Sequence, residues 1–237
     1  MHHTNREFAK VRKTLLITGC GRSGTKYATF VLRRLGLDVR HEKMGEDGVA
    51  SWFMAVDAKT VPFGDASRNF VFNHVFHQVR HPLTVIPSVA SFKEDTWRFV
   101  CAHAPIDINE RLLLRCAKYW YYWNLNAEKI ADWRYRIEDF ETVFNPFCER
   151  LGVVPDTRVL EQISRDVNTR KLGWAFHVYE ELCNRLGQTP KPLIKRWLSV
   201  NKNRDGQHPM SWNSLQLLDG ELTENIRRKA LDYGYTT

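Results

Sequence analysis

One short stretch, residues 15–27 with the sequence LLITGCGRSGTKY, places the strongest limit on how this chain can fold. It begins as an apolar run, which is typical of a buried parallel strand, and then passes through three closely spaced glycines into a helical pattern. Glycines let the backbone turn tightly enough for several N–H groups to point at one anion, and the positive end of the following helix adds to that attraction. The stretch therefore predicts a strand, an anion-binding loop and a helix.

The pattern after this loop indicates the fold class. Residues 26–36 carry apolar side chains at helical spacing and end at a glycine, and residues 37–42 have the pattern of a second strand. A strand, loop, helix and strand form a βαβ unit, which implies a parallel sheet with right-handed crossovers. We therefore expect an α/β protein with a P-loop-like three-layer αβα fold and a central parallel sheet.

Similar patterns recur further along the chain. They predict strands at 70–80 and 133–140, and helices at 81–92, 108–131, 141–152 and 222–235. The chain contains no internal repeats and no low-complexity linker. We therefore expect a single domain over residues 1–237, with a helical and loop-rich C-terminal third from about residue 160.

The composition limits the partners and the compartment. The 237 residues include 35 Lys and Arg against 27 Asp and Glu, and the net charge of +8 favours anionic partners, although solubility alone accounts for it equally well. The 5 cysteines are far apart and lack CxxC spacing, which argues against a zinc site and a disulfide framework. No stretch approaches the roughly 20 apolar residues of a membrane helix, and the N-terminus is too polar for a signal peptide. We expect a cytoplasmic protein.

The glycine loop differs from the nucleotide-kinase loop G-x-x-x-x-G-K-[ST]. Gly19 and Gly24 have that spacing, but Thr25 and Lys26 follow in the reverse order, so the magnesium-binding hydroxyl is displaced. No hydrophobic strand ends in an obvious magnesium-binding aspartate. A kinase that uses ATP and magnesium is therefore the alternative interpretation rather than the first. A non-enzymatic binder of anionic polymers ranks last, because it does not explain the loop.

The stretch GRSGTKY, residues 21–27, resembles the 5′-phosphosulfate loop of the sulfotransferase family, whose pattern is roughly [KR]-[ST]-G-[ST]. In that family a second strand ends in an arginine, a serine follows eight residues later, and the two hold a 3′-phosphate. The stretch VRHPLTVIPSV, residues 79–89, supplies Arg80 and Ser88 at that spacing. Two motifs in the expected order, each after a predicted strand, are more specific than either alone.

The resemblance implies transfer of a sulfuryl group from 3′-phosphoadenosine 5′-phosphosulfate (PAPS), without a metal, to leave 3′-phosphoadenosine 5′-phosphate (PAP). The acceptor would be a hydroxyl of a carbohydrate, a lipid or a small alcohol, and no nucleic-acid partner is implied. Arg22 stands where cytosolic members have a catalytic lysine, and it would hold the leaving phosphate as a bidentate cation. The implied donor-binding residues are Gly21, Arg22, Ser23, Gly24, Thr25, Lys26, Arg80 and Ser88.

The stretch LDVRHE, residues 37–42, resembles the tyrosylprotein sulfotransferase branch, in which a glutamate at a similar position is the catalytic base. Glu42 matches that glutamate by position. His41 is the second candidate, since cytosolic members use a histidine on a later segment as the base. A carboxylate or an imidazole can both remove the proton from an acceptor hydroxyl, so the choice between Glu42 and His41 stays open here.

The remaining donor contacts are less well defined by the sequence. The adenine ring needs an aromatic or apolar slot, for which Trp52 and Trp174 are candidates. A late basic contact to the 3′-phosphate would come from residues 168–171 or 200–204, and the family's RKGxxG form is missing. The stretch YRIEDF, residues 135–140, resembles the family's strand with a following acidic residue, which we interpret as structural.

Overall fold

The computed structural model describes residues 10–56, 69–163, 171–172, 199–200 and 210–237. The chain divides into two compact units, one formed by residues 1–162 with 209–237 and the other by residues 163–208. In the second unit, strands β6 (Lys171–Leu172) and β7 (Ser199–Val200) pair in antiparallel fashion. A single domain over the whole chain stays a prediction, because most of the second unit lies outside the described residues.

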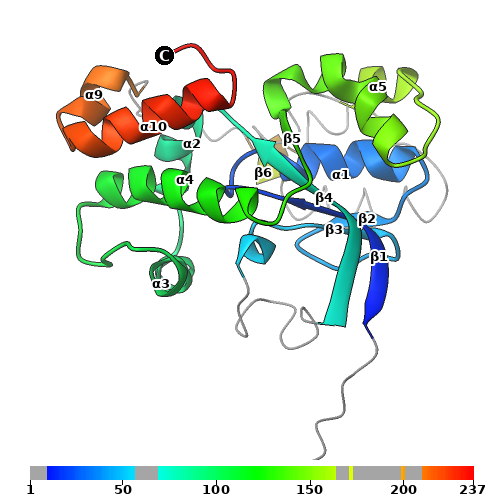
Figure 1. Cartoon of the computed structure of the whole chain (residues 1–237), viewed down its shortest axis with the longest axis horizontal. Helices are drawn as coiled ribbons and strands as arrows, with labels where there is room; N and C mark the ends of the chain where they lie inside the picture. The colour runs from blue at the N-terminus through cyan, green and yellow to red at the C-terminus, as the bar shows by residue number, and fades with distance from the viewer. Residues whose placement is uncertain (1–9, 57–68, 164–170, 173–198, 201–209) are drawn as a thin grey trace, which may run out of the picture. The chain divides into compact units, whose positions relative to one another are not determined.

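The first unit is built around a five-stranded sheet with the order β2-β3-β1-β4-β5 (Figure 1). All four strand pairings are parallel, as the βαβ pattern predicted. The strands are β1 (Val11–Thr18), β2 (Val39–His41), β3 (Gly48–Ala50), β4 (Phe70–Val79) and β5 (Trp133–Arg136). The sequence did not predict β3, which is short and begins with a glycine, a residue that is uncommon in strands.

The helices surround this sheet. They are α1 (Thr25–Arg34), α2 (Pro82–Val89), α3 (Glu94–His103), α4 (Leu112–Glu128), α5 (Phe140–Arg150), α6 (Arg158–Gln162), α9 (Trp212–Gln216) and α10 (Gly220–Asp232), with short 3-10 turns η1 (Phe53–Ala55) and η3 (Ile137–Asp139). Helix α3 was not predicted from the sequence, and α4 begins four residues later than the helix predicted at 108–131. The predicted strand at 133–140 ends at Arg136, where the chain enters η3.

Alternating side chains of β4 show how the helices form two layers. The ring of Phe76 packs against Phe147 of α5, with 5.3 Å between centroids. The next residue points the other way, because His77 Nε2 lies 3.0 Å from Asn124 Oδ1 on α4. Helices α1 and α5 therefore lie on one face of the sheet and α4 on the other (Figure 1). This confirms the three-layer αβα fold.

The parallel sheet brings the predicted site residues to one edge. The carboxyl ends of parallel strands share an edge, and Thr18, His41 and Val79 end β1, β2 and β4 there. The chain passes from β1 to β2 and β3 on one side and then to β4 and β5 on the other, so the strand order reverses at β1. Open α/β sheets bind ligands at such a reversal of strand order. A ligand site is therefore expected at the carboxyl end of β1.

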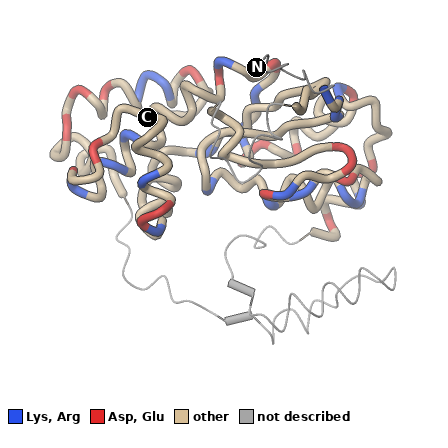
Figure 2. Tube along the Cα trace, turned by 90° about the horizontal axis from the view of Figure 1, so that it is seen from below, with Lys and Arg blue, Asp and Glu red and all other residues tan. Residues whose placement is uncertain are grey.

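Two general features of the described residues complete the fold. Figure 2 shows Lys and Arg interspersed with Asp and Glu along the helices. Among the described helices, none is both long and apolar enough to cross a membrane.

Candidate functional site

The glycine loop, residues 19–24, joins β1 to α1 and is shaped by close contact with two neighbouring elements. A Cβ on Gly19, whose φ is 144°, would lie 2.3 Å from the carbonyl oxygen of Gln78. A Cβ on Gly21 would lie 2.9 Å from Tyr119 Oη, the atom to which the Gly21 N–H donates a hydrogen bond. Only glycine fits at these two positions, because backbone and a buried ring occupy the space.

Several hydrogen-bond donors of the loop have no partner among the described residues. Helix α1 begins directly after Gly24 and has neither a side-chain cap nor an acidic residue in its first turn. In the part of the chain that the structure describes, no hydrogen bond uses the N–H groups of Gly24, Thr25 or Lys26. The hydroxyl of Ser23 is also fully buried and has no hydrogen-bond partner in the described part of the chain. A helix N-terminus with several unpaired donors is suited to bind an anion.

A buried network holds the loop from behind. Gln78 Nε2 donates to the Ser23 carbonyl oxygen at 2.5 Å, and Gln78 Oε1 accepts from Tyr135 Oη at 2.6 Å. All three residues are buried, and the network ties the loop to β4 and β5. Gln78 and Tyr135 were not predicted as site residues from the sequence. The one available signal was a glutamine near the end of β4, a strand expected to be buried, since a buried amide needs partners.

Two cations flank the loop. The exposed Arg22 has a left-handed φ of 72°, a conformation that costs a non-glycine residue about 1–3 kcal/mol. Its guanidinium lies over the Phe92 ring at 5.5 Å, and Arg22 Nη2 donates to Ser91 Oγ at 2.9 Å. The Lys26 ammonium lies 5.8 Å from the centroid of Phe30 in α1. Both residues therefore lie at the end of α1 that carries the unpaired N–H groups, and the Lys26 ammonium lies beside Phe30, one turn into the helix.

The second motif lies beside the first. Arg80 directly follows β4, and its Nη1 donates to the carbonyl oxygen of Arg22 at 3.2 Å across 58 positions of sequence. Ser88 lies on α2, and its carbonyl oxygen accepts from Ser91 Oγ at 3.0 Å, the same hydroxyl that accepts from Arg22. Ser91 had no role in the sequence prediction. The fold thus brings Arg22, Arg80 and Ser88 into one neighbourhood.

Glu42 follows β2 at the same edge of the sheet and also has a left-handed φ, of 52°. Its Oε2 accepts from Ser51 Oγ at 2.6 Å, whereas Oε1 is buried and makes no hydrogen bond to any residue that the structure describes. Burial raises the pKa of Glu42 to about 7, against the opposing hydrogen bonds from Ser51 and the Trp52 backbone. The result is a carboxyl group with one uncommitted oxygen and a pKa suited to proton transfer near neutrality.

His41 has a different electrostatic setting. Partial burial, and then the positive charge of Lys26, lower the pKa of His41 to about 4. His41 is consequently neutral at pH 7 and a weaker base than Glu42. The two side chains are neighbours, with 4.0 Å between His41 Nε2 and Glu42 Oε1. Because a general base works best when its pKa lies near the working pH, this comparison favours Glu42.

We expect the raised pKa of Glu42 to appear in the pH dependence of stability. Between its ordinary value of 4.5 and the folded value of about 7, the folded state binds more protons than the unfolded state. Stability therefore falls as pH rises through this range. Glu42→Gln removes the effect, so its melting temperature should rise relative to the wild type between pH 5 and pH 8. Thermal unfolding measures this, and a constant difference across the range would contradict the assignment. Glu46→Gln, at an exposed position, should follow the wild type.

The residues predicted to contact the adenine ring and the 3′-phosphate late in the chain are only partly described by the structure. Trp52 is 9% exposed, stacks on Phe92 with 5.7 Å between centroids, and accepts a hydrogen bond from Trp123 on its carbonyl. It is part of the aromatic packing beneath the loop. Trp174 lies outside the described residues, as do most of 168–171 and 200–204. The described ends of those two stretches, Lys171 and Val200, are paired in the β6–β7 ladder.

Comparisons with known proteins address the fold. No protein-family model and no curated protein matches the sequence. Among solved structures, a sulfotransferase domain from the curacin biosynthetic pathway matches with a TM-score of 0.51 and 13% identity, over 96% of this chain and 99% of that one. The mouse sulfotransferase SULT7A1 complexed with PAP matches with a TM-score of 0.44 and 13% identity, over 94% and 87% of the two chains. The first likeness shows that the chain has the fold of a sulfotransferase domain.

Proposed function

We propose that the protein is a sulfotransferase that moves a sulfuryl group from PAPS to an acceptor hydroxyl of a carbohydrate, a lipid or a small alcohol. The observation that carries the proposal is the 3.2 Å contact between Arg80 Nη1 and the Arg22 carbonyl oxygen, which joins the two motifs at the carboxyl edge of the sheet. Two anion-binding elements side by side suit a nucleotide with two separate phosphates. The fold shared with the curacin-pathway sulfotransferase domain supports the same assignment.

The residues present fit such a donor. The unpaired N–H groups at the start of α1 and the orphaned hydroxyl of Ser23 would bind the 5′-phosphate. Gly21 lets the loop pack closely against Tyr119, and Arg22 adds a positive charge. Arg80 and Ser88 would bind the 3′-phosphate. When bound, PAPS supplies the activated sulfuryl group.

Each catalytic residue then has a defined task. Glu42 takes the proton of the acceptor hydroxyl on Oε1, the oxygen without a hydrogen bond among the described residues. Arg22 and the loop N–H groups stabilise the negative charge that grows on the leaving phosphate. One S–O bond forms to the acceptor oxygen, and one breaks at the phosphate, which keeps the electron pair and departs as PAP. The sulfated product carries the transferred group, and the proton remains on Glu42.

Calorimetric titration tests the proposal directly. We expect the wild-type protein to bind PAP in preference to ATP, and to do so without magnesium. Preference for ATP with magnesium would contradict the proposal and support the kinase alternative. Turnover of PAPS with a panel of carbohydrate, lipid and alcohol acceptors would then identify the acceptor class.

Arg80→Ala should remove the selectivity for the 3′-phosphate. Loss of a charge-assisted hydrogen bond is expected to weaken PAP binding by roughly 10- to 100-fold while leaving adenosine 5′-phosphate binding close to wild type. The matched control is Arg12→Ala, since Arg12 pairs with Asn73 near the amino end of the sheet. An unchanged affinity ratio in Arg80→Ala would remove Arg80 from the donor site.

A further inference from the structure

The backbone around Arg80 is held by hydrogen bonds from two directions. The Arg80 carbonyl oxygen accepts from Trp120 Nε1 of α4 at 3.1 Å. The next N–H, that of His81, donates to Glu138 Oε1 at 3.0 Å. The peptide group that follows Arg80 is therefore fixed at both its oxygen and its nitrogen, one held from α4 and the other from η3.

Glu138 is itself held by the end of the chain. Its second oxygen, Oε2, accepts from Tyr235 Oη at 2.8 Å, so both carboxylate oxygens are engaged. Burial, and then the negative charge of Glu138, raise the pKa of Tyr235, which keeps the hydroxyl protonated as a donor. The Tyr235 ring also packs edge-on against His81, with 5.0 Å between centroids. Residues 155 positions apart in sequence, from Arg80 to Tyr235, are thereby linked through one carboxylate.

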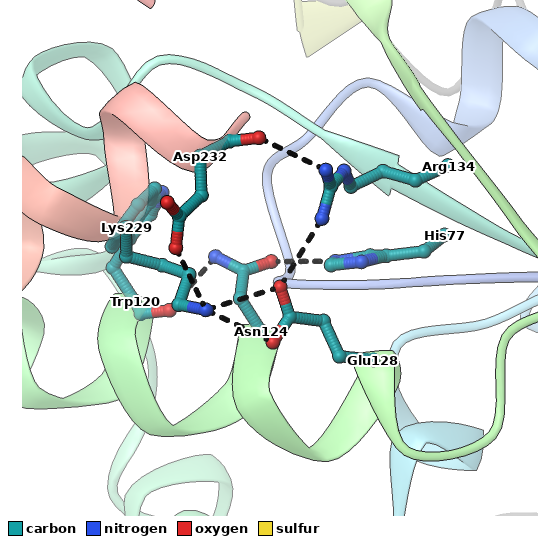
Figure 3. Close-up of polar contacts among 7 residues, drawn as sticks. All are labelled: His77, Trp120, Asn124, Glu128, Arg134, Lys229 and Asp232. Atoms are coloured by element: carbon teal, nitrogen blue, oxygen red, sulfur yellow. Dashed lines mark hydrogen bonds and ion pairs between the residues drawn. The ribbon is translucent and has the colours of Figure 1, made fainter. Parts of the chain in front are cut away.

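Helix α10, which ends three residues before Tyr235, is anchored independently of this contact. Glu128 of α4 lies 3.3 Å from Lys229 of α10 and 3.3 Å from Arg134 of β5 (Figure 3). Arg134 Nη2 also donates to the carbonyl oxygen of Asp232 at 2.9 Å. These contacts hold the end of α10 against α4 and β5, so loss of the Tyr235 hydroxyl alone should not release the helix.

We propose that Glu138 and Tyr235 are positioning residues of the donor site, which orient the Arg80–His81 backbone so that the Arg80 guanidinium meets the 3′-phosphate. The inference rests on the proposed function and extends it to the last residues of the chain. Arginine has several rotatable bonds, so its reach depends on where its backbone is fixed. A role in fold stability alone would affect all ligands of the site equally, whereas a positioning role affects the 3′-phosphate selectively.

Tyr235→Phe tests the inference with a single lost hydroxyl. We expect PAP affinity to fall by roughly 3- to 10-fold, the range of one net hydrogen bond, while adenosine 5′-phosphate affinity stays close to wild type. Glu138→Gln, whose amide nitrogen cannot accept a hydrogen bond, should change the ratio in the same direction. Calorimetry measures both ligands, and thermal unfolding confirms that each variant is folded at the temperature used.

The matched control is Tyr233→Phe, two residues earlier, because the Tyr233 hydroxyl has no hydrogen bond among the described residues and phenylalanine keeps the packing of the ring against His77 and Trp120. It should leave the ratio of the two affinities unchanged. In an Arg80→Ala background, Tyr235→Phe should have no further effect on that ratio, since the side chain that it positions is gone.

The outcomes separate the two proposals. Equal weakening of both ligands by Tyr235→Phe and Glu138→Gln, or no weakening, would overturn the positioning role while leaving the sulfotransferase proposal intact. A wild-type protein that binds PAP no better than adenosine 5′-phosphate would overturn the proposed function itself, and the inference with it.

Discussion

Glu42→Gln is expected to lower kcat for sulfuryl transfer by about 100- to 10,000-fold, the range for loss of a general base, with little change in PAP affinity. The amide oxygen can still accept the hydrogen bond from Ser51, but it cannot take a proton from the acceptor. The measurement is PAP release at saturating PAPS with the best acceptor of the panel, beside a calorimetric titration of PAP.

The pH profile and two controls make this result specific. The wild-type kcat should rise with pH and level off above about 7, as Glu42 loses its proton, and the variant should lack this rise. Glu46→Gln should retain wild-type turnover. His41→Gln should have a small effect, because a base with a pKa of about 4 drives proton transfer weakly. A large loss in His41→Gln with normal turnover in Glu42→Gln would reverse the assignment of the base.

Arg22→Ala is expected to lower kcat/KM for PAPS by roughly 100- to 1,000-fold, the usual loss when one donor to a developing negative charge is removed. Arg22 is exposed, so the folded structure should tolerate the change. The strain of the left-handed backbone should stay the same, because alanine at this position keeps the same φ. Steady-state turnover across PAPS concentrations measures the loss, with thermal unfolding as a check on folding.

Two further variants show whether the effect belongs to the position of the charge. Arg22→Lys keeps the charge but loses the bidentate geometry and the reach to Ser91, so an intermediate loss is expected. Arg33→Ala removes an exposed arginine from the last turn of α1 and should leave turnover unchanged. If Arg33→Ala and Arg22→Ala lost activity equally, general positive charge rather than the loop would explain the result.

Local patterns in the sequence predicted the part of the site that is local in space. The strand, glycine loop and helix are encoded within residues 15–34, where apolar runs, glycine spacing and helical periodicity act over a few positions. The spacing of Arg80 and Ser88 is local for the same reason. The parallel sheet was predictable because two strands joined by a crossover helix run in the same direction when they belong to one sheet. The strand β3 was missed, because it is short and begins with a glycine, which local patterns associate with turns rather than strands.

The sequence by itself determined the αβα fold and the edge of the sheet at which the loop, Glu42 and Arg80 meet. Only the tertiary structure decided which hydrogen bonds fix those residues and which pKa Glu42 has. Tyr119 reaches Gly21 across 98 positions, and Tyr235 reaches Glu138 across 97. No local pattern encodes such a contact, because each partner is an ordinary residue of its own helix or turn. The pKa of Glu42 likewise depends on the neighbours that bury it, and burial is a property of the folded chain.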